Sequence, residues 1–191
     1  MGHAVKSVIK YSYADYLTWN DDERWEIIDG IPYSMSPAPI RKHQKVQFNI
    51  SLIIGNFLKG KKCQAFNPPF DVRFSTKDEQ DVLIENVVQP DLVVFCNEKN
   101  LDEKGGIGPP DFVIEILSPS SADRDFGEKT LLYQDYAVKE YWIIDPDKRI
   151  VYTTLLNREK RFKAWTKYDA KSKIKCTVLK GLVIDAKEIF S

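Results

Sequence analysis

The sequence has no long apolar run and little of the composition that marks disorder. None of its 191 residues falls in an uninterrupted hydrophobic stretch near the ~18 residues of a membrane-spanning helix, and no apolar leader opens the chain. It contains only 10 Pro and 9 Gly, whereas 43% of its residues are hydrophobic, which argues against disorder. We therefore expect a folded cytoplasmic protein without a membrane partner, built as one domain over residues 1–191.

Cysteine is also scarce. Cys63, Cys96 and Cys176 stand far apart, and none of them forms a CxxC pair. An odd and scattered set of cysteines indicates neither a zinc site nor a disulfide framework. Cys96 ends an apolar run, so we expect it to be a small buried hydrophobic residue.

Net charge is absent, because 28 Lys and Arg balance 28 Asp and Glu, so bulk charge indicates no nucleic-acid partner. The charges are nevertheless unevenly distributed. Residues 78–128 contain 13 Asp or Glu and 3 Lys or Arg, whereas residues 148–180 contain 11 Lys or Arg and 2 Asp or Glu. A cation site beside a polyanion-binding surface would show this pattern, and so would a solvated, lysine-rich β-surface.

Hydrophobic periodicity predicts an α/β fold with a mixed central β-sheet flanked by helices. The predicted helices lie at 13–19, 43–59 and 125–137, the last with Asp125 as its cap and Glu128 reaching back. Two short strands are expected around the Asp29-Gly30 turn. The other predicted strands lie at 67–75, 91–96, 112–117, 140–146, 149–156, 160–168 and 181–190.

A glutamate interrupts one of the apolar runs. In "PPDFVIEIL" Glu115 shares a strand face with Val113 and Leu117. An unpaired buried carboxylate costs several kcal/mol, so a cation, a hydrogen-bond network or water must compensate it. Asp91 heads another apolar run, after Pro90, and the two carboxylates converge if their strands are neighbours. Such a pair suits Mg²⁺, which takes oxygen ligands and keeps several waters.

A lysine stands in the first turn of the helix predicted over 125–137. Lys129 lies on one stripe with Leu132, Tyr133 and Tyr136, which we expect to face the sheet. The helix macrodipole disfavours an ammonium group at this end, so Lys129 needs an anionic partner, for which Glu115 is available. A purely structural Glu–Lys pair, or a lysine whose ammonium reaches solvent, would account for the same residues.

Several motifs occur in the order and spacing of a known family. They are "RWEIIDG", "SPAPIRKHQ", "QPDLVVF" and the long segment "PPDFVIEILSPSSADRDFGEKTLLYQDYAVKEYWIIDP". Over residues 13–185 the chain resembles the Uma2 family of restriction-endonuclease-like proteins, a bacterial group, abundant in cyanobacteria, with the PD-(D/E)XK nuclease fold. The resemblance implies a metal-dependent endonuclease that hydrolyses phosphodiester bonds in DNA, uses Mg²⁺ or Mn²⁺, and acts as a homodimer.

The resemblance also implies roles for particular residues. Asp91 matches the aspartate of the PD element and Glu115 the acidic residue of the (D/E)XK element. With the backbone carbonyl of Ile116 they would bind the metal. Leu117 stands where the superfamily has its lysine, and Lys129, which matches the lysine of the family's "GEK" segment, would replace it from the helix.

Two further positions, Glu26 and His43, have two interpretations each, and a third position, Gln89, has weaker support. Glu26, which matches a family position, either extends the metal site and takes part in catalysis or bonds nearby amides as a hairpin carboxylate. His43 also matches, and either approaches the site or is a hydrogen-bonded structural histidine. Gln89 precedes the PD step and is a further candidate.

Two other functions stay open. The absence of a lysine at Leu117 and the zero net charge favour a nuclease fold used as a binding or interaction module without turnover. A glycosidase that uses Asp91 and Glu115 as its carboxylate pair would need a sugar cleft lined with aromatic residues. In the endonuclease interpretation, the basic segment 148–180 would contact backbone phosphates, which gives affinity without sequence specificity.

Overall fold

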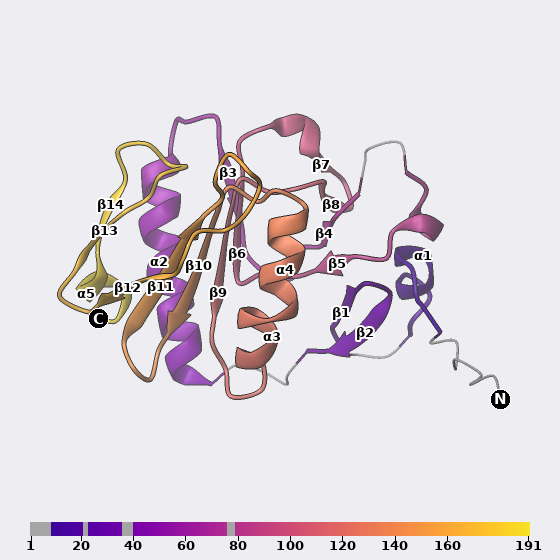
Figure 1. The fold of residues 1–191 in the computed structure, drawn as a ribbon, viewed down its shortest axis with the longest axis horizontal. Helices are drawn as coiled ribbons and strands as arrows, with labels where there is room; N and C mark the ends of the chain where they lie inside the picture. The colour runs from indigo at the N-terminus through magenta and orange to yellow at the C-terminus, as the bar shows by residue number, and fades with distance from the viewer. Residues whose placement is uncertain (1–8, 21–22, 36–39, 76–78) are drawn as a thin grey trace.

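The computed structural model describes residues 9–20, 23–35, 40–75 and 79–191 (Figure 1). Its larger sheet has the strand order β12 (Thr166–Asp169), β11 (Ile150–Leu155), β10 (Glu140–Asp145), β9 (Phe112–Ile116), β6 (Leu92–Phe95) and β3 (Gln64–Phe66). β9 and β10 run parallel, whereas β6 pairs antiparallel with β9 and β11 antiparallel with β10. The predicted mixed α/β class, and the strands predicted at 91–96, 112–117 and 140–146, are confirmed.

Helices cover both faces of this sheet. α2 (Arg41–Leu58) lies against one face, and α3 (Ala122–Phe126) and α4 (Glu128–Asp135) lie against the other (Figure 1). Phe112, Ile114 and Ile116 pack into the core with α2, whereas Val113 packs into the core with α4. The predicted alternation of side chains along β9 is therefore confirmed, and it directs Glu115 to the face that α4 covers.

A second six-stranded sheet brings the N-terminal hairpin to the same region. Its strands are β2 (Ile31–Ser34), β1 (Trp25–Ile28), β5 (Val87–Val88), β4 (Val72–Arg73), β8 (Gly105–Ile107) and β7 (Leu101–Asp102). The turn between β1 and β2 is formed by Asp29 and Gly30, whose φ angles are 52° and 79°. Positive φ at both central residues is the requirement of a type I′ hairpin turn, so the predicted tight turn is confirmed.

The helix predicted over 125–137 is wrong as one continuous element. It is divided at Gly127 into α3 and α4, and a β-carbon at Gly127 would lie 2.7 Å from the carbonyl oxygen of Asp123. Asp125 consequently does not cap a helix; it lies within α3 and is only 2% exposed. Lys129 lies in the first turn of the next helix, α4, and is buried with Leu132 and Tyr133.

Other predicted strands are shorter than expected. Of 67–75 only Val72–Arg73 is strand, because the two prolines at 68 and 69 have no N–H groups for a ladder. Of the strand predicted over 160–168, only residues 166–168 belong to β12. The segment 181–190 is divided between β14 (Val183–Asp185), which pairs with β13 (Lys173–Lys175), and α5 (Ala186–Ile189). Asp185 caps α5, since its side chain accepts a hydrogen bond from the N–H of Lys187.

The prediction for the cysteines is also wrong. Cys63 and Cys96 form a disulfide, and Cys96 is bonded rather than a simple hydrophobic residue. β3 and β6 pair antiparallel with Gln64 opposite Phe95, so the next residues along, Cys63 and Cys96, face each other. Their separation of 33 residues contains no sign of this register. Cys176 is buried as a free thiol.

Among the described residues, the remaining α-helix is α1 (Tyr13–Tyr16), within the helix predicted at 13–19, and two 3₁₀ helices span Asp81–Leu83 and Glu98–Asn100. None of the helices in the part of the chain that the structure describes is both long and apolar enough to cross a membrane.

Candidate active site

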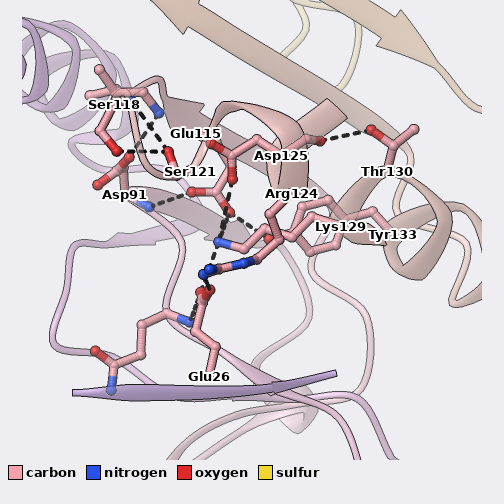
Figure 2. Close-up of polar contacts among 12 residues, drawn as sticks. Glu26, Asp91, Glu115, Ser118, Ser121, Arg124, Asp125, Lys129, Thr130 and Tyr133 are labelled. Carbon is pink, nitrogen blue, oxygen red and sulfur yellow. Dashed lines mark hydrogen bonds and ion pairs between the residues drawn. The ribbon is translucent and has the colours of Figure 1, made fainter. Parts of the chain in front are cut away.

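Asp91 and Glu115 face each other at the ends of two neighbouring strands. β6 and β9 pair with Leu92 opposite Ile114, so the next pair in the register is Asp91 and Glu115. The N–H of Asp91 lies 3.4 Å from Glu115 Oε2, and the N–H of Ile116 donates to Asp91 Oδ2 at 2.7 Å (Figure 2). The register therefore brings both residues to the wall of one cavity, with Glu115 buried and Asp91 at the rim.

Lys129 enters the same point from α4. Its Nζ lies 2.9 Å from Glu115 Oε1, 2.8 Å from Glu26 Oε1 and 3.7 Å from Asp125 Oδ1. The lysine is 4% exposed, so solvent screens these charges poorly. Figure 2 shows its ammonium group between the carboxylates of β1 and β9. The structure thus brings together Asp91, Glu115, Lys129 and Glu26.

Glu26 bonds a nearby amide, as the hairpin interpretation predicts, and its part in a metal site or in catalysis stays a prediction. Its side chain projects from β1 and accepts a hydrogen bond from the N–H of Gln89 at 3.0 Å, as a hairpin carboxylate would. It also holds Lys129 and lies 3.7 Å from Arg124 Nη1. Gln89 contributes its backbone here, whereas its side-chain amide donates to Asp71 Oδ1 at 2.9 Å.

His43 reaches the site from the first turn of α2. Its Nε2 lies 3.2 Å from Asp91 Oδ2, and the ring is 6% exposed. Burial by itself would lower the pKa of His43, but the hydrogen bond and the charge of Asp91 outweigh it and raise the pKa overall. A protonated His43 would hold the Asp91 carboxylate in place, so the histidine both approaches the site and is hydrogen-bonded.

Three residues that the sequence did not assign to the site also contact it. The hydroxyl of Tyr133 donates to Glu115 Oε1 at 2.6 Å. Asp125 is buried, and its Oδ1 accepts no hydrogen bond within the described residues. Arg124 lies beside Glu26 with its guanidinium 4.5 Å from the centre of the Tyr33 ring. The i,i+4 spacing of Asp125 and Lys129 was the available signal for the aspartate.

Negative charge exceeds positive charge in this cluster. Three carboxylates, of Glu26, Glu115 and Asp125, lie within 4 Å of one buried ammonium, and Arg124 approaches only the outer edge. Such an excess is costly in a buried site unless protons or a cation neutralise part of it.

The pKa values follow from that crowding. Burial raises the pKa of Glu115 to about 8 although Lys129 opposes the shift, and burial raises the pKa of Asp125 to about 6. For Lys129, burial alone would lower the pKa, but Glu115, Glu26 and Asp125 raise it well above its usual value. The lysine therefore stays charged, whereas Glu115 holds a proton at neutral pH that a cation would displace.

The donor atoms suit a hard divalent cation, although they do not form a complete cage. Within the described ranges no group of three or more His, Cys, Asp or Glu side chains has the arrangement of a metal site. The two facing carboxylates of Asp91 and Glu115 are present, however, and continuing the register puts Pro90 opposite Ile116. Because proline has no N–H, it cannot donate to the Ile116 carbonyl. Two carboxylates and a carbonyl fit Mg²⁺, which binds few protein oxygens and retains water.

The cavity over these residues is small and polar. It has a volume of about 120 Å³, room for a hydrated ion or a phosphate group. Its wall includes the hydroxyl residues of the loop before α3, but no Phe, Tyr or Trp among the residues that the structure describes. A glycosidase would need such an aromatic lining, so the cavity does not favour that alternative. The outer wall is formed by Arg24, Ser34, Met35, Ser118, Ser120, Ser121 and Arg124.

A mixed α/β fold with two acids at neighbouring strand ends and a buried lysine on the adjoining helix α4 defines a nuclease-like protein. A model of the Uma2 family, described as "Putative restriction endonuclease", matches residues 13–185, and the chain belongs to that family. The chain is 30% identical over 135 residues to the protein slr1290 of Synechocystis sp. The aligned region covers 66% of this chain and 67% of that protein.

The fold is likewise that of a known structure. A protein of Anabaena variabilis, described as a "putative nuclease belonging to DUF820", superposes with a TM-score of 0.72 over 94% of this chain and 97% of that one. The two sequences are 21% identical, so this likeness establishes the fold and not the residue roles.

Proposed function

We propose that this protein is an endonuclease that hydrolyses phosphodiester bonds in DNA with a bound Mg²⁺ or Mn²⁺ ion. The observation that carries the proposal is that Asp91 and Glu115 line one cavity, beside a lysine that contacts three carboxylates. A nuclease family implies a nucleic-acid substrate. In a homodimer, two such sites would be available for the two strands of a duplex.

Asp91, Glu115 and the carbonyl of Ile116 would hold the ion. When bound, a divalent cation polarises a phosphoryl oxygen and lowers the pKa of a coordinated water. His43 would keep Asp91 oriented through its 3.2 Å contact, and Tyr133 would do the same for Glu115 through its 2.6 Å hydrogen bond.

Lys129 would supply positive charge to the reacting phosphate. Glu26 and Glu115 hold its ammonium group on two sides, so its position is fixed before substrate arrives. Arg124 lines the same cavity, and its guanidinium can bind two phosphate oxygens at once. Together these cations would stabilise the negative charge that develops as the phosphodiester bond breaks.

One observation favours the second candidate function, a binding module without turnover. The ammonium of Lys129 already contacts two carboxylates, as in a structural ion pair, and Leu117 occupies the position of the superfamily's lysine. Calorimetric titration with Mg²⁺ separates the two functions. Binding that is lost in Asp91→Asn supports the endonuclease, and the absence of binding to the native protein supports the module.

Metal affinity should increase with pH. The pKa of Glu115 is raised to about 8, so below that pH the carboxyl group holds a proton that Mg²⁺ must displace. We expect affinity to rise by up to about tenfold per pH unit between pH 6 and 8, and to level off above that. Calorimetry at pH 6, 7 and 8, in two buffers of different ionisation enthalpy, measures both the affinity and the protons released. A pH-independent affinity with no proton release would contradict this role of Glu115.

A further inference from the structure

Positive charge gathers beside the candidate active site, on the first turns of α2 and the turn between β10 and β11. Lys42, Lys45 and Arg149, here called the α2 basic face, line a shallow cavity of about 230 Å³. All three residues are exposed. The floor of the cavity is formed by Val46, Pro146 and Phe190, and the guanidinium of Arg149 lies 5.8 Å from the centre of the Phe190 ring.

The α2 basic face adjoins the candidate site along α2, where His43 lies between Lys42 and Lys45 in sequence. Residues 42 and 45 are three apart on a helix and therefore neighbours on its surface, whereas His43 points inward and contacts Asp91 at 3.2 Å. Lys42 and Lys45 thus lie within about one helical turn, roughly 5.4 Å along the axis, of the residue that contacts the proposed metal ligand. Successive phosphates of one strand advance about 3.4 Å along the duplex, so neighbouring phosphates can reach this face.

Few of these charges are neutralised by the protein. In the described part of the chain, neither Lys45 nor Arg149 forms an ion pair with a carboxylate. Lys42 contacts Asp147 at 2.6 Å, but their side chains are 60% and 64% exposed. An ion pair so open to water contributes little, so Lys42 can exchange Asp147 for a phosphate.

Arg149 occupies an unusual backbone position for its residue type. Its φ angle is 54°, a left-handed conformation that glycine and asparagine adopt more readily. The turn therefore carries a cation where another residue would fit the backbone more easily, and it holds that cation at the α2 basic face.

We propose that the α2 basic face binds the backbone phosphates of DNA on one side of the reacting phosphate. The inference rests on the proposed function for the identity of that phosphate, but not on turnover. Of the basic segment 148–180, which as a whole was expected to contact DNA, only the part around Arg149 belongs to this face. β12 lies three strands from β9 in the sheet, about 14 Å away, whereas Arg149 lies beside α2.

The salt dependence of DNA binding tests this proposal. Fluorescence anisotropy with a labelled duplex, in metal-free buffer from 50 to 200 mM salt, gives the affinity and its salt slope without hydrolysis. Each lost phosphate contact lowers the slope by about 0.9, so Lys42→Ala/Lys45→Ala should reduce it by about 1.8. The affinity of this variant should fall at least about tenfold at 100 mM salt.

Two further variants separate phosphate binding from a general loss of charge or structure. Asp147→Asn should strengthen DNA binding, because it removes the carboxylate that competes for Lys42. Lys167→Ala/Lys173→Ala removes the same number of exposed charges from β12 and β13, and should keep the native slope.

A native salt slope in Lys42→Ala/Lys45→Ala would overturn the proposal. A decrease of the slope in Lys167→Ala/Lys173→Ala as large as that in Lys42→Ala/Lys45→Ala would also overturn it. Tighter binding of an acidic peptide than of the duplex at this face would also overturn it, in favour of a protein partner. DNA binding of the expected slope by a protein that never cleaves would leave this inference standing and remove the proposed endonuclease. Cleavage by the native protein, together with a native salt slope in Lys42→Ala/Lys45→Ala, would support the endonuclease and overturn this inference.

Discussion

Asp91→Ala is expected to abolish metal-dependent cleavage of DNA, with a loss of about 10³-fold or more. Asp91 and Glu115 are the two carboxylates that face each other at the strand ends, and neither can replace the other as an ion ligand. Glu115→Ala should therefore produce a loss of the same size. The measurement is the initial rate of cleavage of a supercoiled plasmid in Mg²⁺, and again in Mn²⁺.

The control is Glu128→Ala, which removes an exposed carboxylate next to Lys129 in sequence. It should cleave at nearly the native rate, because Glu128 lies outside the cavity. Asp91→Ala leaves His43 without its partner, so the fold of each variant is checked by circular dichroism and thermal unfolding. Cleavage at the native rate by a folded Asp91→Ala protein would remove Asp91 from the catalytic assignment.

Lys129→Met is expected to lower the free energy of unfolding by about 3–5 kcal/mol, because it leaves buried carboxylates without their cation. The loss should depend on pH. Burial raises the folded-state pKa values of Glu115 and Asp125, to about 8 and about 6, so their protonated forms are favoured on folding. That contribution is present at low pH and lost as pH rises through these values, and Lys129 offsets the loss in the native protein.

The destabilisation should thus be smaller at pH 5 than at pH 8, as measured by urea unfolding at both pH values. Adding Glu26→Gln to Lys129→Met removes one of the stranded charges and should recover part of the loss. Lys173→Met, at an exposed lysine of β13, provides the matched control and should leave stability nearly unchanged. A Lys129→Met protein as stable as the native one at pH 8 would mean that the lysine neutralises no buried charge.

The central part of the site follows from local rules, which is why the sequence predicted it. Side chains alternate along a strand, so Glu115 had to lie on the face opposite Phe112 and Ile114. Residues three and four apart share a helix face, so Lys129 had to point with Leu132 and Tyr133. Neither rule needs knowledge of distant contacts.

The parts that sequence reasoning missed depend on a local break in a helix or on contacts between distant segments. Asp125 fits a capping pattern in sequence, but the break at Gly127 turns α3 so that this aspartate is buried beside Lys129. The Cys63–Cys96 disulfide arises from the β3–β6 register, which no spacing between the two cysteines reveals. Arg124 carries no periodic signal, because α3 is only five residues long.

The excess of acid in the cluster has a consequence for stability. Natural proteins keep such crowded charges where function needs them, at a cost to the free energy of folding. Within this chain, Glu26, Glu115 and Asp125 all lie within 4 Å of one ammonium group, an arrangement that a divalent cation would relieve.

Anomalous diffraction from crystals soaked in Mn²⁺ tests the central claim most directly. The account predicts a peak between the carboxylates of Asp91 and Glu115, about 2.1–2.4 Å from an oxygen of each and near the carbonyl of Ile116. A Mn²⁺ ion bound elsewhere, with Asp91 and Glu115 unliganded at saturating metal, would contradict it.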